Sequence, residues 1–304
     1  MASCCRLGSL LRITPIAEGS VNSNYFIDTE KGRFFLRIYE EQGKDGVRYE
    51  RALLGHLGRA IPVPRPIVHD GDEILEVLGK PVGVFEVVLG DPICQAGVTD
   101  DHAGEVGRML GTIHAAGTTF ASRRSSRFGV DDVRDRLKSI AAPSRAIEDA
   151  RHEIGRAIDD AVRALPCGAT GGVIHGDLFR DNVRWDGTSI VAVIDWESAS
   201  DGLYAYDLMV TMLAWCFGSE MDWDLSRKMV AGYHAVRPLA PVDVAALWPA
   251  ALLAAARFTT TRITDYALRE AKGPRVMKDY RRFLERLRVI RGLSPADFTG
   301  RLTR

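Results

Sequence analysis

Hydrophobic and polar positions divide the chain into a strand-rich part, which ends near residue 90, and a helix-rich remainder. Alternating apolar residues bounded by polar turns predict strands over 13–18, 25–29, 33–39, 73–78 and 81–89. Apolar residues at helical spacing predict a helix over 46–59. Pro62, Pro64 and Pro66 then predict an extended connector. The first part is therefore interpreted as a small antiparallel sheet with one helix.

The remainder is predominantly helical in its pattern. Helices are predicted over 100–116, within the charged stretch 131–164, and over 203–217, 222–233, 241–271 and 275–291. One exception is a predicted hairpin, whose strands at 183–185 and 190–194 flank a turn at Asp186-Gly187. We therefore expect an α+β fold with two lobes, a sheet lobe at 1–90 and a larger helical lobe at 91–304.

The hairpin lies among polar residues whose order is typical of phosphoryl transfer. His175-Gly176-Asp177 precedes it, Asn182 follows, and Asp195 ends the second apolar strand. One Asp can accept the proton of an attacking hydroxyl, while an Asn and a second Asp can hold the magnesium that spans the phosphates. We therefore predict Asp177 as the catalytic base and Asn182 and Asp195 as metal ligands, which the hairpin would bring together.

Each of these residues has a simpler interpretation when it is taken alone. An Asp beside a turn usually caps the local backbone. His175 is interpreted as a structural brace of the loop rather than an acid or a base. Asp207 either anchors the same loop from the next helix or caps that helix. The complete pattern is much rarer than its parts, and it favours the functional interpretation.

A resemblance to the aminoglycoside phosphotransferase and choline kinase superfamily is carried by the blocks HGDLFRDN, VIDWESA and AYDLMV. A likeness to bacterial homoserine kinases of the aminoglycoside-phosphotransferase type is carried by IAEGSVNSNYFIDTEKGRFFLRIYE, IPVPRPI, ARFTTTRITDYALRE and KDYRRFLERLR. The likeness thus covers nearly the whole chain. It implies a protein-kinase-like fold and an enzyme that uses ATP and Mg²⁺ to phosphorylate the hydroxyl of a small molecule.

The resemblance also implies roles for charged residues. Arg37 stands where kinases usually place a phosphate-binding Lys, and Arg is a good bidentate phosphate ligand. Glu50 on the predicted helix would pair with Arg37, unless it is a solvated surface charge. Arg180 stands where close relatives usually have Pro, which we expect to alter the loop only slightly.

Two further segments are expected to contact the nucleotide. The turn Gly19-Ser20-Val21 can direct backbone N–H groups at phosphate, with a plain hairpin turn as the alternative. Backbone groups of Glu86 and Val88 fall where the kinase hinge binds adenine.

L-Homoserine is the leading acceptor that the resemblance implies. Its carboxylate would bind Arg257 or Arg262, and its ammonium would bind a carboxylate such as Glu197 or Asp201. Structural ion pairs are the alternative for these four residues. An aminoglycoside, choline or ethanolamine, a methylthioribose or a hydroxylated amino acid stays open as the acceptor. Because the usual strand Lys is absent, a nucleotide-binding regulator without catalysis is the rival of a different class.

Composition narrows the partners and the compartment. The chain has 304 residues, of which 46% are apolar, and its 40 basic and 40 acidic residues balance. Because the net charge is zero, neither nucleic acid nor a membrane is expected as a partner. Five cysteines without metal-ligand spacing indicate a reducing compartment, and the stretch 242–256 is too short and too polar to span a bilayer. We expect a cytoplasmic protein, and the sequence leaves its oligomeric state open.

Overall fold

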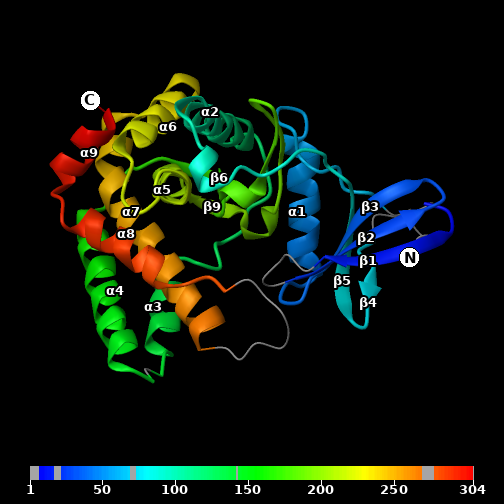
Figure 1. The fold of residues 1–304 in the computed structure, drawn as a ribbon, viewed down its shortest axis with the longest axis horizontal. Coiled ribbons are helices and arrows are strands. Elements are labelled where there is room, and N and C mark those ends of the chain that lie inside the picture. Colours follow the sequence, from blue (N-terminus) through cyan, green and yellow to red (C-terminus); the bar gives the residue numbers. More distant parts are fainter. Residues whose placement is uncertain (1–6, 17–21, 69–72, 142, 269–276, 304) are drawn as a thin grey trace.

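The computed structural model describes residues 7–16, 22–68, 73–141, 143–268 and 277–303. In these residues the chain forms a sheet lobe, at the right of Figure 1, and a larger helical lobe at the left. Helix α1 (Lys44–Leu57) stands between the two. The two-lobed α+β architecture predicted from the sequence is confirmed.

In the described residues, the sheet lobe is built on one antiparallel sheet of five strands. Its strands lie in the order β1 (Leu10–Ile16), β2 (Ser23–Thr29), β3 (Gly32–Ile38), β5 (Lys80–Glu86) and β4 (Glu76–Val77). The register places Leu36 opposite Val84, and both side chains lie in a small buried core beneath the sheet. β4 is shorter than the predicted strand 73–78 because the chain turns at Leu78, whose φ is +52°.

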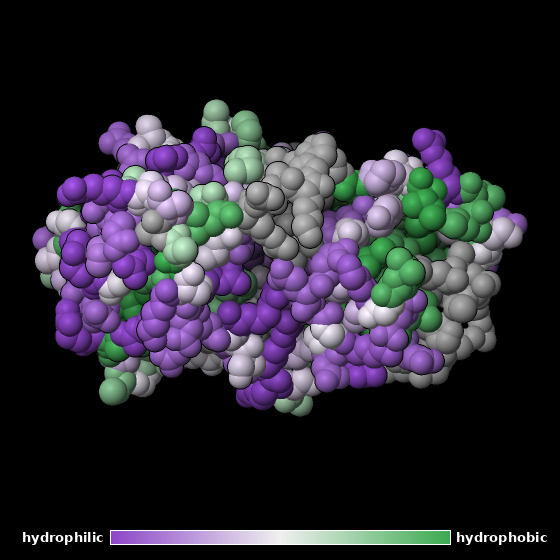
Figure 2. Space-filling model, turned by 90° about the horizontal axis from the view of Figure 1, so that it is seen from below, coloured by the Kyte–Doolittle hydropathy of each residue, from purple (hydrophilic) through white to green (hydrophobic). Residues whose placement is uncertain are grey.

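β1 is an edge strand of this sheet and carries apolar side chains to the surface. Leu10, Leu11 and Ile13 are 47%, 67% and 53% exposed. Figure 2 shows apolar atoms gathered over the sheet lobe, whereas the visible face of the helical lobe is mostly hydrophilic. The two lobes therefore differ in surface as well as in architecture.

Helix α1 packs into the core of the helical lobe. Its residues Leu53 and Leu57 are fully buried and belong to one continuous apolar cluster with the helices of that lobe. The proline segment that follows runs between the lobes, and Val193 N–H donates to Pro62 O at 2.9 Å. The segment thus acts as the predicted connector and contacts the hairpin of the helical lobe.

We propose that the lobes divide near Gly90. β5 ends at Glu86, earlier than the predicted end at 89, and Asp91 already exchanges two backbone hydrogen bonds of 3.0 Å with Trp185. Gly90 has a φ of +98°, and a Cβ there would lie 2.6 Å from Val191 Cγ2. Glycine therefore suits this crossing for both conformational and steric reasons.

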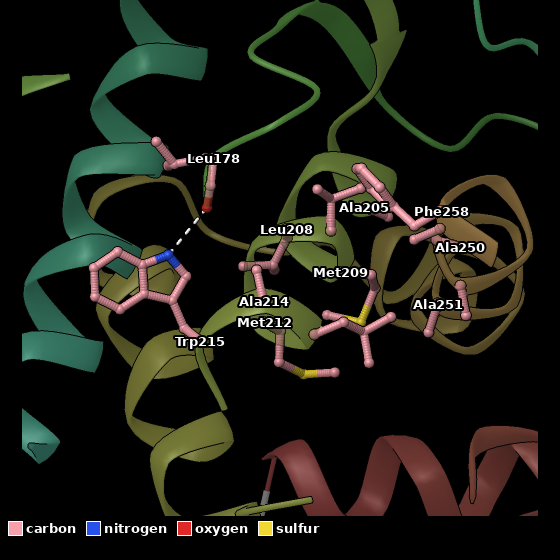
Figure 3. Close-up of a cluster of buried hydrophobic side chains, with 14 of the residues drawn as sticks. Leu178, Ala205, Leu208, Met209, Met212, Ala214, Trp215, Ala250, Ala251 and Phe258 are labelled. Carbon is pink, nitrogen blue, oxygen red and sulfur yellow. Dashed lines mark hydrogen bonds between the residues drawn. The ribbon is translucent and has the colours of Figure 1, made fainter. Parts of the chain in front are cut away.

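The helical lobe is arranged around α5 (Tyr204–Trp215), which Figure 1 shows end-on. The other helices of this lobe are α2 (Asp100–Gly117), α3 (Val130–Lys138), α4 (Arg145–Ala164), α6 (Trp223–Val236), α7 (Pro241–Arg262), α8 (Arg281–Arg291) and α9 (Pro295–Thr303). Nearly every α5 side chain is buried, and Figure 3 shows Met209 beside Ala251 of α7. A helix enclosed on all sides has no polar face, which explains its continuous apolar sequence.

Several predicted boundaries were wrong. The helix predicted over 241–271 is regular only to Arg262 and continues as a π-helical turn, Ile263–Ala267. In the described residues, the helix predicted over 275–291 begins at Arg281, and the pattern missed α9. It also missed the antiparallel pair β6 (Gly171–Ile174) and β9 (Ser200–Leu203). These strands are short and contain Gly and Ser, so no apolar alternation marks them.

The segment Pro241–Ala267 is long and apolar enough to span a membrane by length and composition. The expectation that this region is too short and too polar was therefore wrong in its reason, since the helix extends beyond 242–256. However, 78% of the apolar window is buried inside the protein. Such burial is typical of a core helix, and α7 packs against α5 in this core.

Helices α2 and α6 approach each other at glycine, and this contact can be tested. A Cβ added to Gly107 would lie 2.0 Å from Met229 O, so Gly107→Ala must push the helices apart. We expect a loss of about 1–3 kcal/mol of unfolding free energy in urea denaturation. Gly155→Ala in α4 is the matched control, because the nearest atom to its Cβ would be 4.0 Å away. Equal stability of both variants would contradict the tight crossing.

Candidate active site

The predicted hairpin is confirmed, and it brings the two predicted metal ligands together. β7 (Val183–Asp186) pairs with β8 (Ser189–Val193) in antiparallel register. Just beyond the paired strands, Ile194 N–H donates to Asn182 O at 2.9 Å. Asp195 is the next residue, so local hairpin geometry brings it back beside Asn182.

Asn182 and Asp195 present oxygens that suit a hard divalent cation. Asn182 Nδ2 donates to Asp177 O at 2.8 Å, which leaves Oδ1 available as an acceptor. Asp195 has a φ of +67°, an uncommon conformation for a residue with a side chain. No group of three His, Cys, Asp or Glu side chains in the described ranges could cage an ion. Phosphate oxygens and water would therefore complete the shell, as is usual for Mg²⁺.

Asp177 is partly buried and lies among charges of both signs. Burial raises the pKa of its carboxyl to about 7. The positive charges of Arg257 and Lys278 oppose this rise, while the negative charges of Asp195 and Asp181 add to it. A carboxylate with a pKa near neutrality is well matched to accept a proton from a hydroxyl at neutral pH.

His175 is a structural brace, as predicted. Its Nδ1 accepts the backbone N–H of Asp177 at 3.2 Å, and its Nε2 lies 3.1 Å from Ile194 O. Because a carbonyl can only accept, Nε2 carries the proton and the ring is neutral. Burial also lowers the pKa of His175. The ring thereby ties the segment that carries Asp177 to the segment that carries Asp195.

Asp207 anchors the same loop from α5, as the first of its two interpretations predicted. Its two carboxylate oxygens accept the backbone N–H groups of His175 and Gly176, both at 2.7 Å. His114 Nε2 lies 3.0 Å from the same carboxylate and Tyr233 Oη is 2.8 Å from His114 Nδ1. Burial opposes ionisation, but these hydrogen bonds and nearby charges leave the pKa of Asp207 below its usual value.

Arg257 and Arg262 were predicted to bind the carboxylate of the acceptor. In the structure, Arg257 supports the loop that carries Asp177. Its guanidinium donates to Gly176 O and lies 3.9 Å from the ring centroid of Phe128. Arg262 is held differently: Nη1 donates to Asp279 O at 3.1 Å, and the group stacks 4.4 Å from the ring centroid of Phe283. Burial lowers the pKa of Arg262 to about 10.

Sequence reasoning missed Lys278. It fell within the helix predicted over 275–291, but it lies before α8 and its charge acts on Asp177. Burial opposes its charge, yet the carboxylate of Asp177 leaves the pKa of Lys278 above its usual value. No spacing in the sequence links these residues, so only the fold reveals their proximity.

Asp201 forms an ion pair, the alternative that the sequence left open, and its contact with an acceptor ammonium stays a prediction. Arg123 Nη1 donates to one carboxylate oxygen at 2.9 Å and Arg124 N–H donates to the other at 2.8 Å. Glu197 accepts from Asn22 Nδ2 at the contact between the lobes. Burial and the charge of Asp195 raise the pKa of Glu197 to about 7.

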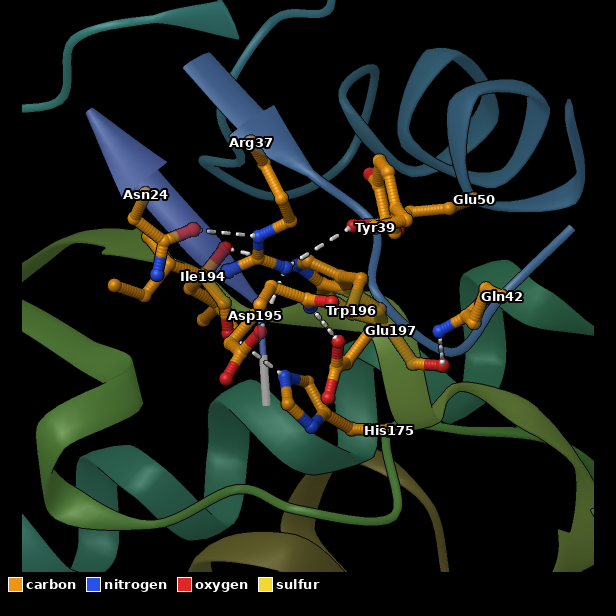
Figure 4. A network of polar contacts seen from close by, with 12 residues as sticks. Asn24, Arg37, Tyr39, Gln42, Glu50, His175, Ile194, Asp195, Trp196 and Glu197 are labelled. Carbon is orange, nitrogen blue, oxygen red and sulfur yellow. Dashed lines mark hydrogen bonds and ion pairs between the residues drawn. The ribbon is translucent and has the colours of Figure 1, made fainter. Parts of the chain in front are cut away.

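Arg37 forms the predicted pair with Glu50, but it binds Asp195 more closely. Figure 4 shows Arg37 reaching from β3 toward Asp195 in the helical lobe. The Arg37 Nη1 to Asp195 Oδ1 distance is 2.8 Å, against 3.9 Å to Glu50 Oε1. Tyr39 Oη donates to Glu50 at 2.9 Å. Both lobes therefore meet at a carboxylate predicted to bind metal.

The predicted nucleotide contacts stay predictions. Gly19, Ser20 and Val21 lie outside the described residues. Glu86 closes β5, and its N–H donates to Arg65 O at 2.9 Å. Val88 lies in the irregular connector that follows.

Arg180 links the loop to α5. Its guanidinium donates to Ala214 O in the last turn of α5, a contact that Pro could not make. Trp215 Nε1 donates to Leu178 O at 3.0 Å from the same turn (Figure 3). The end of α5 and the loop that follows Asp177 (residues 178–182, called the catalytic loop below together with Asp177) are thus joined by hydrogen bonds in both directions.

The sequence profile of the phosphotransferase enzyme family matches residues 12–239, well over half of the chain. The chain belongs to this family. The phosphotransferase is 33% identical to the homoserine kinase of Mesorhizobium japonicum, with 97% of this chain and 93% of the relative covered. It is 35% identical to the homoserine kinase of Methylobacterium radiotolerans, with 98% and 94% covered.

Solved structures share the fold of this phosphotransferase. Amicoumacin kinase hAmiN in complex with AMP-PNP, Ca²⁺ and Ami gives a TM-score of 0.71 at 16% identity, covering 91% of this chain and 86% of that one. Choline kinase LicA from Streptococcus pneumoniae gives 0.68 at 15%, covering 96% and 97%. These identities show the fold alone, which is protein-kinase-like. Together with the family, they identify the phosphotransferase as a small-molecule kinase.

The environment of Asp177 makes a prediction about stability. A carboxyl whose pKa is raised by folding contributes stability that is present below its unfolded pKa and lost as the pH rises through the folded value. Since the folded value is about 7, charged Asp177 destabilises the protein at alkaline pH. Asp177→Asn should therefore unfold with about 1–3 kcal/mol more free energy than the wild type near pH 8.

This difference should vanish as the pH falls toward about 4, since protonated Asp and Asn are then nearly isosteric and neutral. Urea denaturation at several pH values measures it. Asp201→Asn is the control, because it weakens two existing contacts and should only lose stability. A less stable Asp177→Asn protein near pH 8 would contradict the burial effect.

Proposed function

We propose that this phosphotransferase transfers the γ-phosphoryl group of ATP to the hydroxyl of L-homoserine with Mg²⁺. The observation that carries the chemistry is the grouping of Asp177 with the metal-suited oxygens of Asn182 and Asp195. The relatives named homoserine kinase, similar along nearly the whole chain, support the acceptor. The neighbour bound to AMP-PNP and Ca²⁺ supports a nucleotide and a divalent metal. The cytoplasm is the proposed compartment.

The residues would share the reaction as follows. Asp177 accepts the hydroxyl proton as the acceptor oxygen bonds to the γ-phosphorus and the bond to the β–γ bridging oxygen breaks, which releases ADP. Asn182 and Asp195 would hold Mg²⁺, which supplies charge neutralisation on the phosphates when bound. His175 and Asp207 keep the loop in place, so the base is positioned before the acceptor arrives.

The nucleotide would lie between the lobes. The turn Gly19-Ser20-Val21 would contact phosphate, and backbone groups of Glu86 and Val88 would bind adenine. Arg37 reaches this region from β3. It would exchange part of its contact with Asp195 for phosphate oxygens, to which Arg can donate two parallel hydrogen bonds.

The acceptor is tested by ADP formation with L-homoserine, choline, ethanolamine, methylthioribose and an aminoglycoside. We expect L-homoserine to give the highest kcat/KM. If another compound is phosphorylated efficiently and L-homoserine is not, the proposed acceptor is wrong. Nucleotide binding without transfer to any acceptor would favour the non-catalytic regulator.

The base is tested by Asp177→Asn. Loss of a general base should lower kcat by about 10²–10⁴-fold. The nucleotide Kd should stay nearly unchanged, since Asp177 is assigned to the acceptor. Asp186→Asn, at the exposed turn of the hairpin, is the matched control and should retain full activity. Full activity of Asp177→Asn would refute the assigned base.

The pH dependence of kcat/KM should report the ionisation of this base. Only the carboxylate accepts a proton, so the rate should rise with pH and level off above about pH 7, the pKa that burial gives Asp177. Steady-state assays from about pH 5.5 to 8.5 measure this profile. A flat profile across this range would show that another group limits the reaction.

A further inference from the structure

Two cations near Asp177, Arg262 and Lys278, are not part of the hydrogen bonds that hold its loop. Arg257 donates to Gly176 O, whereas in the described residues neither Arg262 nor Lys278 forms a hydrogen bond with that loop. Both are nonetheless electrostatically coupled to Asp177. The charge of Lys278 favours the ionised form of Asp177, and the charge of Asp177 favours the protonated form of Arg262. Within the part of the chain that the structure describes, Asp177 forms no ion pair within 4.0 Å. The charges are thus near the base but not in contact with it.

An aromatic cluster holds this region against the catalytic loop. Phe179, which follows Asp177 in the loop, lies with its ring centroid 4.9 Å from Phe258 of α7 and 5.9 Å from Phe283 of α8. Arg262 stacks on the same Phe283. These ring contacts place Arg262 beside the loop, among side chains of α7 and α8, whereas Arg37 meets Asp195 from β3.

Arg262 is partly buried, and its donors are incompletely paired. Nη1 donates to Asp279 O at 3.1 Å, but Nε is buried and has no hydrogen-bond partner. A donor removed from water without a partner is unfavourable, and an anionic ligand can supply that partner. Lys278 directly precedes Asp279, so the backbone that binds Arg262 also positions the second cation.

We propose that Arg262 and Lys278 form the subsite for a carboxylate of the acceptor, which restricts the acceptor class to hydroxy acids. This inference rests on the proposed function and deepens it. Arg provides two parallel donors and Lys a point charge, which together match a carboxylate. The acceptor would bridge the gap between Asp177 and this pair, its hydroxyl at the base and its carboxylate at the cations.

The phosphates of the nucleotide are the other anions that these cations could bind. The oxygens that suit the metal, Asn182 and Asp195, lie with Arg37 at the lobe contact, so phosphates belong on that side. Arg262 and Lys278 come from the α7–α8 side of the helical lobe. Their position favours the acceptor.

The test compares two acceptors in Lys278→Met, Lys278→Arg and the wild type. L-Homoserine carries the carboxylate, and L-homoserinol replaces it with a neutral hydroxymethyl group. Assays run near pH 8.5, above the titration of Asp177, so that a changed ionisation of the base does not enter. Lys278→Met should lower kcat/KM for L-homoserine by about 10- to 100-fold and Lys278→Arg by much less. The KM for ATP should not change.

For L-homoserinol, the wild type should be slow already, and Lys278→Met should cause no further loss. Lys138→Met on the surface of α3 is the matched control and should behave as wild type, since Lys138 is 76% exposed. An equal loss with both acceptors, or a raised KM for ATP, overturns the subsite. If Lys278→Met does not fold, equal kcat/KM of the wild type for both acceptors overturns it as well.

Failure of the proposed function is distinguishable from failure of this subsite. If the enzyme phosphorylates another hydroxy acid and not L-homoserine, only the proposed acceptor is wrong. The same Lys278 variants are then assayed with that acid and with its analogue that lacks the carboxylate. Turnover of carboxylate-free alcohols alone overturns the subsite while leaving the phosphoryl transfer in place.

Discussion

Asp207 places a fully buried carboxylate beneath the loop that carries the base. A buried carboxylate is unfavourable unless it is well hydrogen-bonded, and here two backbone N–H groups and His114 satisfy it. The same bonds fix the backbone of His175 and Gly176, and His175 in turn joins this segment to Ile194. One polar group on the central helix therefore positions both sides of the site.

The contact between the lobes is polar and includes the candidate metal ligand. Arg37 binds Asp195, and Gln42 links Glu197 O at 3.0 Å with Arg124 Nη2 at 2.9 Å, as Figure 4 shows for Gln42 and Glu197. A metal that takes Asp195 as a ligand would compete with Arg37 for its oxygens. Binding of the proposed metal and nucleotide would therefore be coupled to the mutual position of the lobes through one carboxylate.

The site contains features that a purely structural protein would avoid. Burial disfavours the charged form of Asp177, Asp195 has an uncommon backbone conformation, and Arg262 is a partly buried cation with an unpaired buried nitrogen. Each of these features opposes stability, and each would serve the phosphoryl transfer proposed above. The large apolar core around α5 provides the stability that makes such a site possible.

The sequence identified the residues whose relation is local. Asp177, Asn182 and Asp195 lie around one hairpin, and short-range turn geometry places Asn182 beside Asp195 whatever the rest of the chain does. The role of His175 was also accessible because its motif is local, whereas Asp207 lies 32 residues further on and kept two interpretations until the fold decided. The strands β6 and β9 were missed because they pair with each other across a long loop and lack alternation.

Residues whose partners lie far along the chain needed the fold. Arg123, the partner of Asp201, lies 78 residues before it, and Lys278, whose charge acts on Asp177, lies about 100 residues after it. The order of residues in a motif is visible in the sequence itself. Which residue a charged side chain pairs with depends on how the helices and strands pack. Packing depends on the whole apolar pattern at once, so no local stretch of sequence contains it.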